Sequence, residues 1–353
     1  MRARLEDVCE RDSSNLRQAD VAGRSGDYPI YGASGYIGNV DFYHQELPYV
    51  AIVKDGAGIG RTVLLPAKSS VIGTMQYLLP KKNVLPEYLC YVVRYMHLEK
   101  YFSGATIPHI YFRDYKSEEF NLVPVDYQEE IVATLGKIEA IVAARQRQLQ
   151  KLDELVKARF IELFGDMFLN SKAWKKQALD SLADVVSGIT KGRKTKEPQL
   201  IEVPYMAVSN VKDGYIDWTT VKTIQATQQE IEQYRLLPDD VLMTEGGDPD
   251  KLGRGAILKE PLQNCIHQNH IFRVRLNESL ILPAFFEEYL KHQKAKRYFL
   301  GCAKQTTGIA SINMRQLKAL PVLLPPLELQ EQFAAFVEQT DKSKLCGKME
   351  VAA

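Results

Sequence analysis

The first stretch whose residue types could bind a ligand is VKDGAGIGRTVLLP, residues 53–66, where Gly56, Gly58 and Gly60 precede Arg61. A dinucleotide-binding loop needs G-x-G-x-x-G between a strand and a helix, because the helix N-terminus holds the phosphates. Here the third glycine comes one residue early, and residues 62–66 are an apolar, β-branched run ending in proline. The pattern therefore predicts a hairpin turn, in which glycine adopts a positive φ easily.

Other catalytic patterns are incomplete. GITKGRKT, residues 188–195, has three residues rather than four between its glycines, so it is not a Walker A loop. The sequence has no G-x-S-x-G nucleophile motif. His267 and His270, in HQNH, follow a strand-like alternation that favours a structural role over a metal site. We expect a chain that is not itself catalytic and holds no metal or cofactor.

Basic residues offer phosphate contacts. The densest basic cluster lies in a glycine-containing loop and comprises Lys191, Arg193, Lys194 and Lys196. Such a loop either contacts nucleic-acid phosphates or is simply solvated. Arg61 has a counterpart in Arg254, which follows Gly253 in TEGGDPDKLGRGAIL as Arg61 follows Gly60.

Composition limits the class of protein. The 353 residues exceed one typical domain and suggest two or three. The five cysteines are an odd number without a C-x-x-C pair, and the N-terminus lacks the apolar core of a signal peptide, so we expect a reduced, cytoplasmic protein. No apolar run approaches a membrane span. The net charge is only +1, although residues 167–325 carry 22 basic and 17 acidic side chains. Charge therefore permits nucleic-acid binding without requiring it.

The chain contains an internal repeat. Residues 105–135 align without a gap on residues 307–337, at a constant offset of 202. The identities include eight pairs: Ile107/Ile309, Ile110/Ile312, Arg113/Arg315, Lys116/Lys318, Leu122/Leu324, Pro124/Pro326, Gln128/Gln330 and Glu129/Glu331. Upstream the similarity is looser: LEDVC (5–9) parallels LADVV (182–186), and PEYL (86–89) parallels EEYL (287–290). Two related globular units are expected.

Polar residues that differ between the copies could read bases. Thr74, Gln76 and Tyr77 in the first copy, and His267, Gln268 and Asn269 in the second, are expected on a matching strand. Gln and Asn can form paired hydrogen bonds with adenine. Divergence at matching positions suits two units with different targets, but drift produces it too. Arg113 and Arg315 occur in both copies, which favours a structural or phosphate role over base choice.

Each copy ends in a proline followed by a helix. The first helix is expected from Asp126 to about Phe164, roughly 60 Å long. Its apolar residues recur at a spacing of 3.5: Ile131, Leu135, Ile138, Val142, Leu149, Leu152, Val156 and Leu163. This spacing predicts a coiled-coil seam rather than an ordinary amphipathic core helix. The second helix begins similarly, with Phe333 and Val337, and we expect it to end near Leu345.

Two diverged globular units joined by a long helix suggest a bivalent binder, such as one for nucleic acid. The order of these segments resembles the specificity subunit of type I restriction-modification enzymes. The motifs that carry the resemblance are the doubled junction, LVPVDYQEEIVATLGKIEA and LLPPLELQEQFAAFVEQTD, and KLDELVKARFIELFGD at the end of the first helix.

The resemblance implies an α+β fold with two tandem target-recognition domains separated by long conserved coiled-coil helices. The domains would be residues 1–125 and 171–325, with conserved helices in 126–170 and 326–353. Each domain would read half of a split site in double-stranded DNA, with the first helix setting the spacing. The implied partners are modification subunits, which use S-adenosylmethionine, and restriction subunits, which use ATP and Mg²⁺. The chain itself lacks the Asn/Asp-Pro-Pro-Tyr/Phe motif of an adenine methylase, since GDPDK (247–251) has neither the second proline nor the aromatic residue.

The second helix departs from the family pattern, because KLCGKMEVAA (344–353) contains a glycine and no heptad. We expect a shortened helix whose start packs antiparallel against the first helix near Leu152 to Leu163. An apolar stripe at the start of the first helix would then remain open to a partner or to self-association. Two other functions stay open: a two-headed protein scaffold that dimerises through its coil, and, less favoured, an enzyme fused to a recognition domain.

Overall fold

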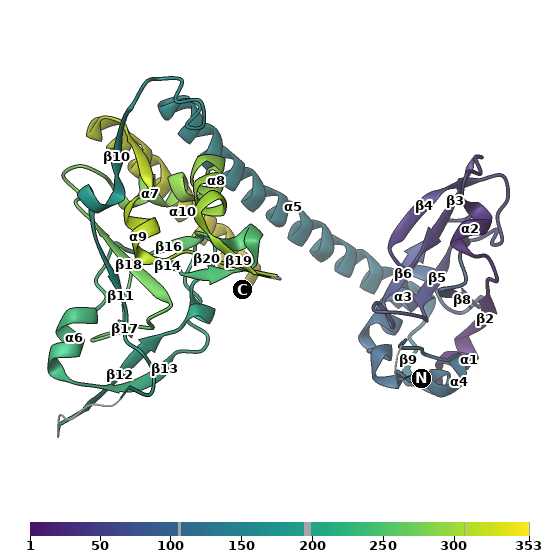
Figure 1. Cartoon of the computed structure of the whole chain (residues 1–353). Helices are drawn as coiled ribbons and strands as arrows, with labels where there is room; N and C mark the ends of the chain where they lie inside the picture. The colour runs from purple at the N-terminus through teal and green to yellow at the C-terminus, as the bar shows by residue number, and fades with distance from the viewer. Residues whose placement is uncertain (105–106, 194–198, 307, 353) are drawn as a thin grey trace. The chain divides into compact units, whose positions relative to one another are not determined.

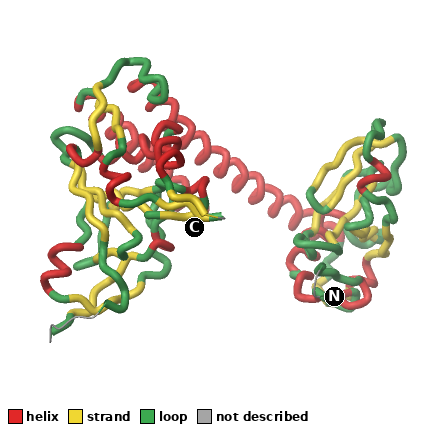
Figure 2. Tube along the Cα trace, viewed as in Figure 1, coloured by secondary structure: helices red, strands yellow, loops and turns green. Residues whose placement is uncertain are grey.

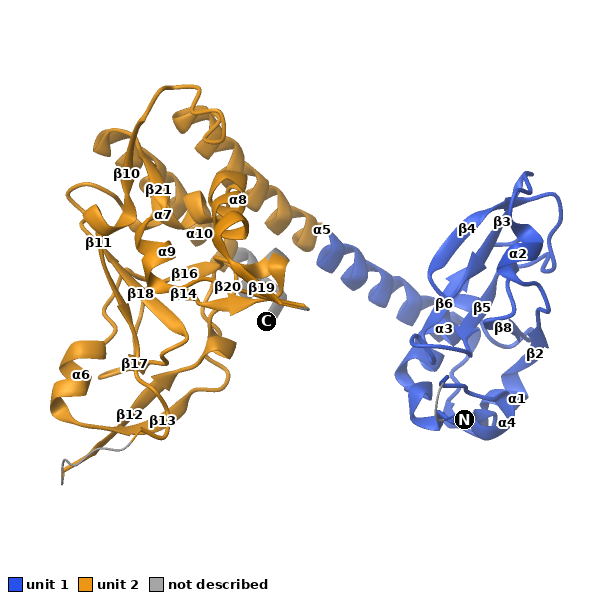
Figure 3. Cartoon of the chain, viewed as in Figure 1, with its two compact units in different colours: residues 1–143 blue, residues 144–353 orange. Residues whose placement is uncertain are grey.

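The computed structural model describes residues 1–104, 107–193, 199–306 and 308–352 (Figure 1). Its elements are mainly antiparallel sheets with short helices, plus two long helices, α5 (Val125–Phe164) and α10 (Leu327–Ala352) (Figure 2). The chain forms two compact units, residues 1–143 and 144–353, so that α5 contributes its beginning to unit 1 and its end to unit 2 (Figure 3). The expected α+β fold with two mixed domains and a long central helix is confirmed.

Unit 1 is built on a four-stranded antiparallel sheet in the order β2 (Cys9–Ser13), β8 (Met75–Pro80), β5 (Tyr49–Val53) and β6 (Thr62–Leu65). Strand β5, with the sequence YVAIV, is buried along its whole length, which explains its continuous apolar run. A smaller sheet has the order β4 (Gly35–Val40), β3 (Tyr28–Gly32) and β7 (Ser70–Val71), with β3 and β7 parallel. The other elements are β1 (Arg2–Arg4) paired with β9 (Glu119–Asn121), α1 (Leu5–Val8), α2 (Gln18–Val21), α3 (Pro86–Tyr95), η1 (Leu98–Tyr101) and α4 (Phe112–Tyr115).

Unit 2 repeats this topology. Its main sheet has the order β11 (Ala183–Ser187), β18 (Ile271–Leu276), β14 (Asp240–Thr244) and β16 (Gly255–Leu258). Its smaller sheet has the order β13 (Lys222–Ala226), β12 (Ile201–Met206) and β17 (Ile266–His267), again with the last two parallel. The pair β10 (Lys175–Ala178) and β21 (Pro321–Leu324) corresponds to β1 and β9. The repeat seen in the sequence is therefore a repeat of the whole fold.

Unit 2 also contains a three-stranded sheet in the order β15 (Gly246–Gly247), β20 (Ile309–Ser311) and β19 (Lys304–Thr306). Its helices besides α10 are α6 (Gln228–Tyr234), α7 (Pro283–Lys291), α8 (Gln293–Cys302), α9 (Met314–Lys318) and the short turns η2 (Leu179–Ser181), η3 (Val208–Asn210) and η4 (Pro249–Lys251).

Matching hydrogen bonds correct two of the looser sequence parallels. Leu5 N donates to Glu118 O and Leu179 N to Leu320 O, each at 3.0 Å, so Leu5 corresponds to Leu179 and not to Leu182. Helices α3 and α7 both begin at a proline, so PEYL (86–89) corresponds to PAFF (283–286), one turn before EEYL. Alignments that rest on a few identical residues can be displaced by about one turn, because a helix presents the same face again every three to four residues.

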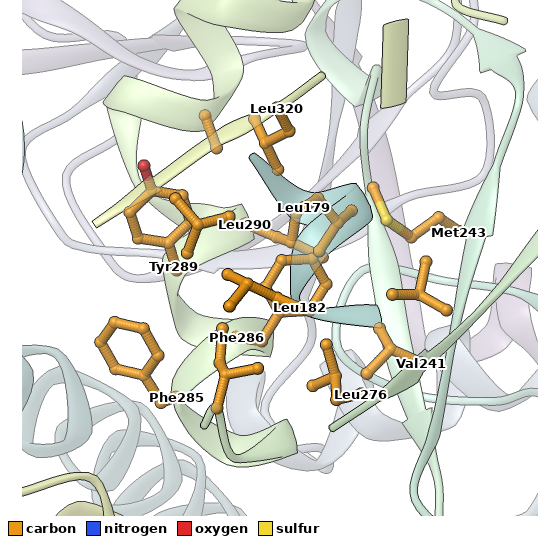
Figure 4. Close-up of a cluster of buried hydrophobic side chains, with 14 of the residues drawn as sticks. Leu179, Leu182, Val241, Met243, Leu276, Phe285, Phe286, Tyr289, Leu290 and Leu320 are labelled. Carbon is orange, nitrogen blue, oxygen red and sulfur yellow. The ribbon is translucent and has the colours of Figure 1, made fainter. Parts of the chain in front are cut away.

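The core of unit 2 includes the end of α5 and the start of α10. Aromatic rings cluster there: Phe160 lies 5.3 Å from Phe333, and Phe164 lies 5.6 Å from Phe333 and 4.9 Å from Phe285, measured between ring centroids. These four rings are buried. The same core continues to α7 and η2, where Phe285, Phe286 and Tyr289 lie beside Leu179 and Leu182 (Figure 4).

Helices α5 and α10 run antiparallel within unit 2. Phe333, early in α10, meets Phe160 and Phe164, whereas Lys344, later in α10, pairs with Asp153, earlier in α5, at 2.8 Å. Val156 and Leu163 are buried in this contact, Leu149 and Leu152 are half-buried, and Val337 packs against the cluster. Helix α10 continues to Ala352, past Gly347, so the expectation that it ends near Leu345 is wrong. A single glycine costs only about 1 kcal/mol in a helix, which does not suffice to end one.

A buried glutamine in the first turns of each long helix joins it to the preceding domain. The Gln128 amide oxygen accepts from Leu85 N at 2.9 Å, and its Nε2 donates to Asn83 O at 3.0 Å and Val123 O at 2.8 Å. The Gln330 side chain makes the same three bonds, with Leu282 N at 2.9 Å, Leu280 O at 3.1 Å and Pro325 O at 2.9 Å. Both side chains are fully buried, so these bonds satisfy backbone groups that water does not reach.

We predict that Gln330→Leu lowers the free energy of unfolding of unit 2 by about 2–4 kcal/mol, because one N–H and two C=O groups lose their buried partner. Both tryptophans, Trp174 and Trp218, lie in unit 2, so their fluorescence during urea unfolding reports on it. The control is Glu331→Gln at the exposed neighbouring residue, which should change the stability by less than about 0.5 kcal/mol. Equal midpoints for the two variants would contradict the role assigned to Gln330.

Candidate DNA interface

The hairpin turn expected from the glycine pattern is present in both units. Val53 N donates to Arg61 O at 2.9 Å, and Thr244 N donates to Arg254 O at 3.3 Å, so the two arginines occupy equivalent positions. The glycine before each has a positive φ, 81° at Gly60 and 74° at Gly253. A strand, β6 or β16, follows each turn, so no helix N-terminus is available for a phosphate. Arg61 is exposed, whereas Arg254 is half-buried.

The candidate base-reading residues do not share a strand. Thr74 precedes β8, and Gln76 and Tyr77 are the second and third residues of that strand. His267 ends β17, the counterpart of β7, since Met206 pairs with His267 as Tyr31 pairs with Val71. The prediction that the two sets lie on equivalent strands is therefore wrong. It equated a central strand of the main sheet in unit 1 with an edge strand of the smaller sheet in unit 2.

Three of these side chains are buried. Gln76 is 2% exposed, and Tyr77 and His267 are 0% exposed. The Tyr77 hydroxyl accepts from Val71 N at 3.0 Å, and burial raises the pKa of Tyr77 to about 12. Burial also lowers the pKa of His267 to about 4, and its Nδ1 lies 3.0 Å from Ile271 O, to which it donates in the neutral form. Buried side chains of this kind cannot contact a base edge, because only side chains at the protein surface can reach the DNA grooves.

Gln268 and Asn269 follow β17 and are half-buried. Gln268 lines a cavity of about 250 Å³ together with Lys191, Lys222 and Thr223. Lys191 and Lys222 are both exposed. One amide side chain and two lysines thus line the same cavity, a combination that suits a base edge flanked by phosphates.

The basic loop near this cavity is only partly available. Arg193 Nε donates to Glu230 Oε1 at 2.5 Å, and the Arg193 guanidinium also bonds to Gln225 O at 3.2 Å. This guanidinium holds the pKa of the Glu230 carboxyl below its usual value. Glu230 is also part of the capping box of α6 with Thr227. The Arg193 charge is thus already compensated, a pairing that sequence spacing could not reveal. Lys194 and Lys196 lie outside the described residues.

Arg113 and Arg315 are exposed at the second residue of α4 and α9, the same position in each unit. The Arg113 guanidinium lies 4.7 Å from the ring centroid of Tyr111. Lys116 and Lys318, three residues further on, pair with Glu6 at 2.8 Å and Asp180 at 3.0 Å. Of the repeated basic residues on these helices, the arginines remain at the surface while the lysines hold the domain together.

Two carboxylate–histidine pairs were not anticipated from the sequence. Asp55 Oδ1 lies 2.6 Å from His109 Nδ1 in unit 1, and Glu245 Oε2 lies 2.5 Å from His270 Nδ1 in unit 2. Each pair involves residues far apart in the chain, so only the hydrogen bonds of the fold reveal it. No group of three His, Cys, Asp or Glu side chains that could hold a metal occurs in the described part of the chain.

Comparison with known proteins decides the family. The profile of the type I restriction modification DNA specificity domain matches residues 1–154 and again residues 171–347. The chain belongs to this family. The two matches coincide with the two copies of the fold, and the family resemblance inferred from the doubled junction is confirmed.

Named relatives agree with this membership. The chain is 23% identical over 253 residues to the type I restriction enzyme EcoKI specificity subunit of Escherichia coli K12, covering 67% of this chain and 53% of that protein. It is 22% identical over 315 residues to the MjaVIII specificity subunit of Methanocaldococcus jannaschii, covering 83% of this chain and 72% of that protein. Another M. jannaschii relative, 29% identical over 169 residues, is covered over 39% of its length. The chain thus spans about half the length of some of the specificity subunits that it resembles.

The crystal structure of the S subunit of a type I restriction-modification system from M. genitalium has the same fold. It matches with a TM-score of 0.62 at 15% identity, covering all of this chain and 92% of that one. No helix in the described ranges is both long and apolar enough to cross a membrane.

If Lys191 contacts a phosphate, Lys191→Ala should reduce the slope of log K against log salt concentration by up to about 0.9, because one counterion fewer is released. Arg193→Ala should change the slope less, since Glu230 already pairs with that charge. Titrations of duplex DNA at several salt concentrations would measure both. Lys342→Ala, on α10 and paired with Glu338 at 2.6 Å, is the control and should leave the slope unchanged. Equal slopes for Lys191→Ala and the control would mean that Lys191 is solvated and does not contact a phosphate.

Proposed function

We propose that the chain is the DNA sequence-specificity subunit of a type I restriction-modification complex. One observation carries the proposal: the same fold occurs twice in the chain, and each copy matches the DNA specificity domain. Two recognition domains of one topology but different surface residues would read the two halves of a bipartite site in double-stranded DNA. In this proposal the domains are residues 1–125 and 171–325, and residues 126–170 and 326–353 hold the two conserved helices.

The chain would supply recognition, and partner subunits would supply the chemistry. Modification subunits would methylate adenine with S-adenosylmethionine, and restriction subunits would use ATP and Mg²⁺. The family membership and the missing methylase motif support this division of roles. The complex would act in the cytoplasm, where cellular DNA is found.

Helix α5 is the proposed spacer between the two recognition domains. It is helical without interruption from Val125 to Phe164, and each end is anchored in its own unit. At the start, Gln128 makes its three buried bonds and Glu139 accepts from Tyr91 at 3.0 Å and from Arg94 at 3.1 Å. At the other end, Phe160 and Phe164 are buried in the core of unit 2. A helix fixed at both ends suits the role of a ruler.

Exchanging residues 171–325 for those of a relative should change one half of the methylated site and leave the other half unchanged. Inserting one heptad after Gln148 should change only the preferred spacer, because it lengthens α5 by about 10 Å and leaves both domains intact. Methylated-base sequencing of a host carrying each variant measures both outcomes. If no methylated motif depends on the chain, and the purified chain shows no salt-dependent binding to duplex DNA, the protein-scaffold alternative gains support instead.

We also propose that α5 offers an apolar face to another helix near its start. Ile131 packs against the core of unit 1, but Ile138 is 52% and Ile141 is 58% exposed, and Leu135 and Val142 are half-buried. Adjacent exposed apolar side chains of this kind mark a contact surface on a helix. The occupant in the assembled complex would be a helix of a modification subunit, and in the isolated chain a second copy.

The isolated chain should therefore self-associate at tens of micromolar, and Ile138→Glu with Ile141→Glu should make it monomeric. Both residues are exposed, so the substitutions leave the folded unit intact. Light scattering gives the mass of each species. Ile161→Glu, at a 55% exposed residue near the other end of α5, is the matched control and should still self-associate. A wild-type chain that stays monomeric at these concentrations contradicts the proposal.

A further inference from the structure

The repeat contains nine identical pairs, the eight named above and Ala133/Ala335, and different physical reasons explain them. Ile110 and Ile312 are each 1% exposed, and Gln128 and Gln330 are the buried glutamines of the long helices. Lys116 and Lys318 form ion pairs within their own units. Leu122 follows β9 and is buried, and Leu324 ends β21 and is half-buried. These pairs are retained because the fold needs them.

The other five pairs are exposed in both units: Ile107/Ile309, Arg113/Arg315, Pro124/Pro326, Glu129/Glu331 and Ala133/Ala335. The alanines lie in the long helices, where alanine is the most favourable residue. The prolines directly precede α5 and α10, where their fixed φ suits a helix start. The glutamates lie near the positive ends of these helices. Arg113 pairs with Asp114 at 3.4 Å and lies over the Tyr111 ring, but the corresponding residues of unit 2 are Gln316 and Asn313, so these contacts do not explain an arginine in both units. The isoleucines have no such explanation either.

Ile107 and Ile309 occupy the same place in their units. Three residues after each, a backbone N–H fixes the loop to the end of a central strand: Ile110 N donates to Lys54 O, and Ile312 N to Glu245 O, both at 2.9 Å. In unit 1 the loop also bonds to the hairpin turn, since Gly56 N donates to Pro108 O at 2.9 Å. In unit 2 the loop is strand β20, which lies beside β19 (Figure 1) and also pairs with β15 at the start of the equivalent turn. Each isoleucine therefore lies beside the turn that carries Arg61 or Arg254.

Their exposure is unusual for a retained apolar residue. Ile107 is 55% and Ile309 is 58% exposed. Single exposed apolar side chains are common on proteins and need no explanation. Here, however, the same residue type stands at the same exposed place in two units whose neighbouring surface has changed. His109 and Tyr111 correspond to Ser311 and Asn313 at the constant offset. Residues without a function diverge at such positions, so the retained isoleucine indicates a ligand common to both units.

A common ligand for two units with different targets must be independent of sequence. An exposed arginine, Arg113 or Arg315, follows each isoleucine by six residues. Duplex DNA offers a binding partner for both side chains. Its phosphates bind arginine, and its bases allow apolar side chains to pack against their edges or between base steps. The residues that differ beside the isoleucines, including the Asp55–His109 and Glu245–His270 pairs, are then free to discriminate between sequences.

We propose that Ile107 and Ile309 are matching apolar contacts to the bases of duplex DNA, one in each half-site, and that Arg113 and Arg315 bind the adjacent phosphates. This inference rests on the proposed DNA-recognition function and specifies which surface of each unit faces the duplex.

The test uses the full chain and two duplexes, one with the recognised site and one with both half-sites scrambled. Ile107→Ala with Ile309→Ala should weaken binding to both duplexes by about tenfold per isoleucine, without changing the salt slope. Arg113→Ala with Arg315→Ala should lower the slope by up to about 0.9 per arginine. The fluorescence of 2-aminopurine, placed in turn along each half-site, should change on binding at one position per half-site and lose that change in the isoleucine variant.

Two further variants serve as controls. Ile107→Val with Ile309→Val keeps an apolar side chain at each place and should retain most of the affinity. Leu47→Ala with Leu262→Ala removes two exposed leucines, 73% and 44% exposed, from other places on the two units and should bind like the wild type.

The outcomes separate this inference from the proposed function. A wild-type chain that binds neither duplex contradicts the proposed function and this inference together. A wild-type chain that binds DNA, with a folded isoleucine variant that binds equally well and keeps the 2-aminopurine signal, overturns this inference alone. Loss of binding to modification subunits with unchanged DNA affinity would overturn it as well, because the surface would then contact protein.

Discussion

Three hydrogen bonds from one buried carboxamide determine how each long helix leaves its domain. A glutamine side chain has two N–H groups and one carbonyl oxygen, and here all three meet backbone groups that the interior hides from water. The partners lie just before α3 or α7 and just before the long helix itself, so the bonds join three segments at one point. Any spacing that the long helix provides depends on this joint, because a helix can hold a domain only as firmly as it is attached to it.

The end of α5 depends on a different interaction. In unit 2, the rings of Phe160, Phe164, Phe285 and Phe333 pack at mostly edge-to-face angles and are excluded from solvent. These residues come from three helices that are distant in sequence. Their packing, with the Lys344–Asp153 ion pair beyond it, orients α10 antiparallel to α5. The start of α5 has no comparable aromatic cluster among the described residues of unit 1, and its apolar side chains remain partly open.

The recognition domains combine a constant frame with a variable surface. The frame is the pair of sheets, the hairpin turn with its arginine and the repeated loop, all held by backbone bonds at equivalent positions. The variable surface includes an aspartate–histidine pair in one unit, a glutamate–histidine pair in the other, and the cavity with Lys191, Lys222 and Gln268. A frame that does not depend on the exposed residues allows the target to change without loss of the fold.

The sequence by itself determined the repeat, the hairpin turn, the long helix and the family, because these features depend on local patterns that recur within the chain. The sequence did not determine the exact alignment of the two copies upstream of the junction. There the parallels were displaced by about one helical turn, since three or four identical residues do not distinguish between neighbouring positions on one helix face. Burial, too, was decided only by the tertiary structure. The residue types of Gln76 and His267 suit contacts with bases, but both side chains are buried in the fold, where neither solvent nor DNA reaches them. The role of Arg193 depends on Glu230, which folding brings to it from 37 residues away, and the exposure of Ile107 depends on a surface that no local pattern encodes. Local patterns report what a segment prefers, whereas contacts between distant segments decide which side chains remain available for binding.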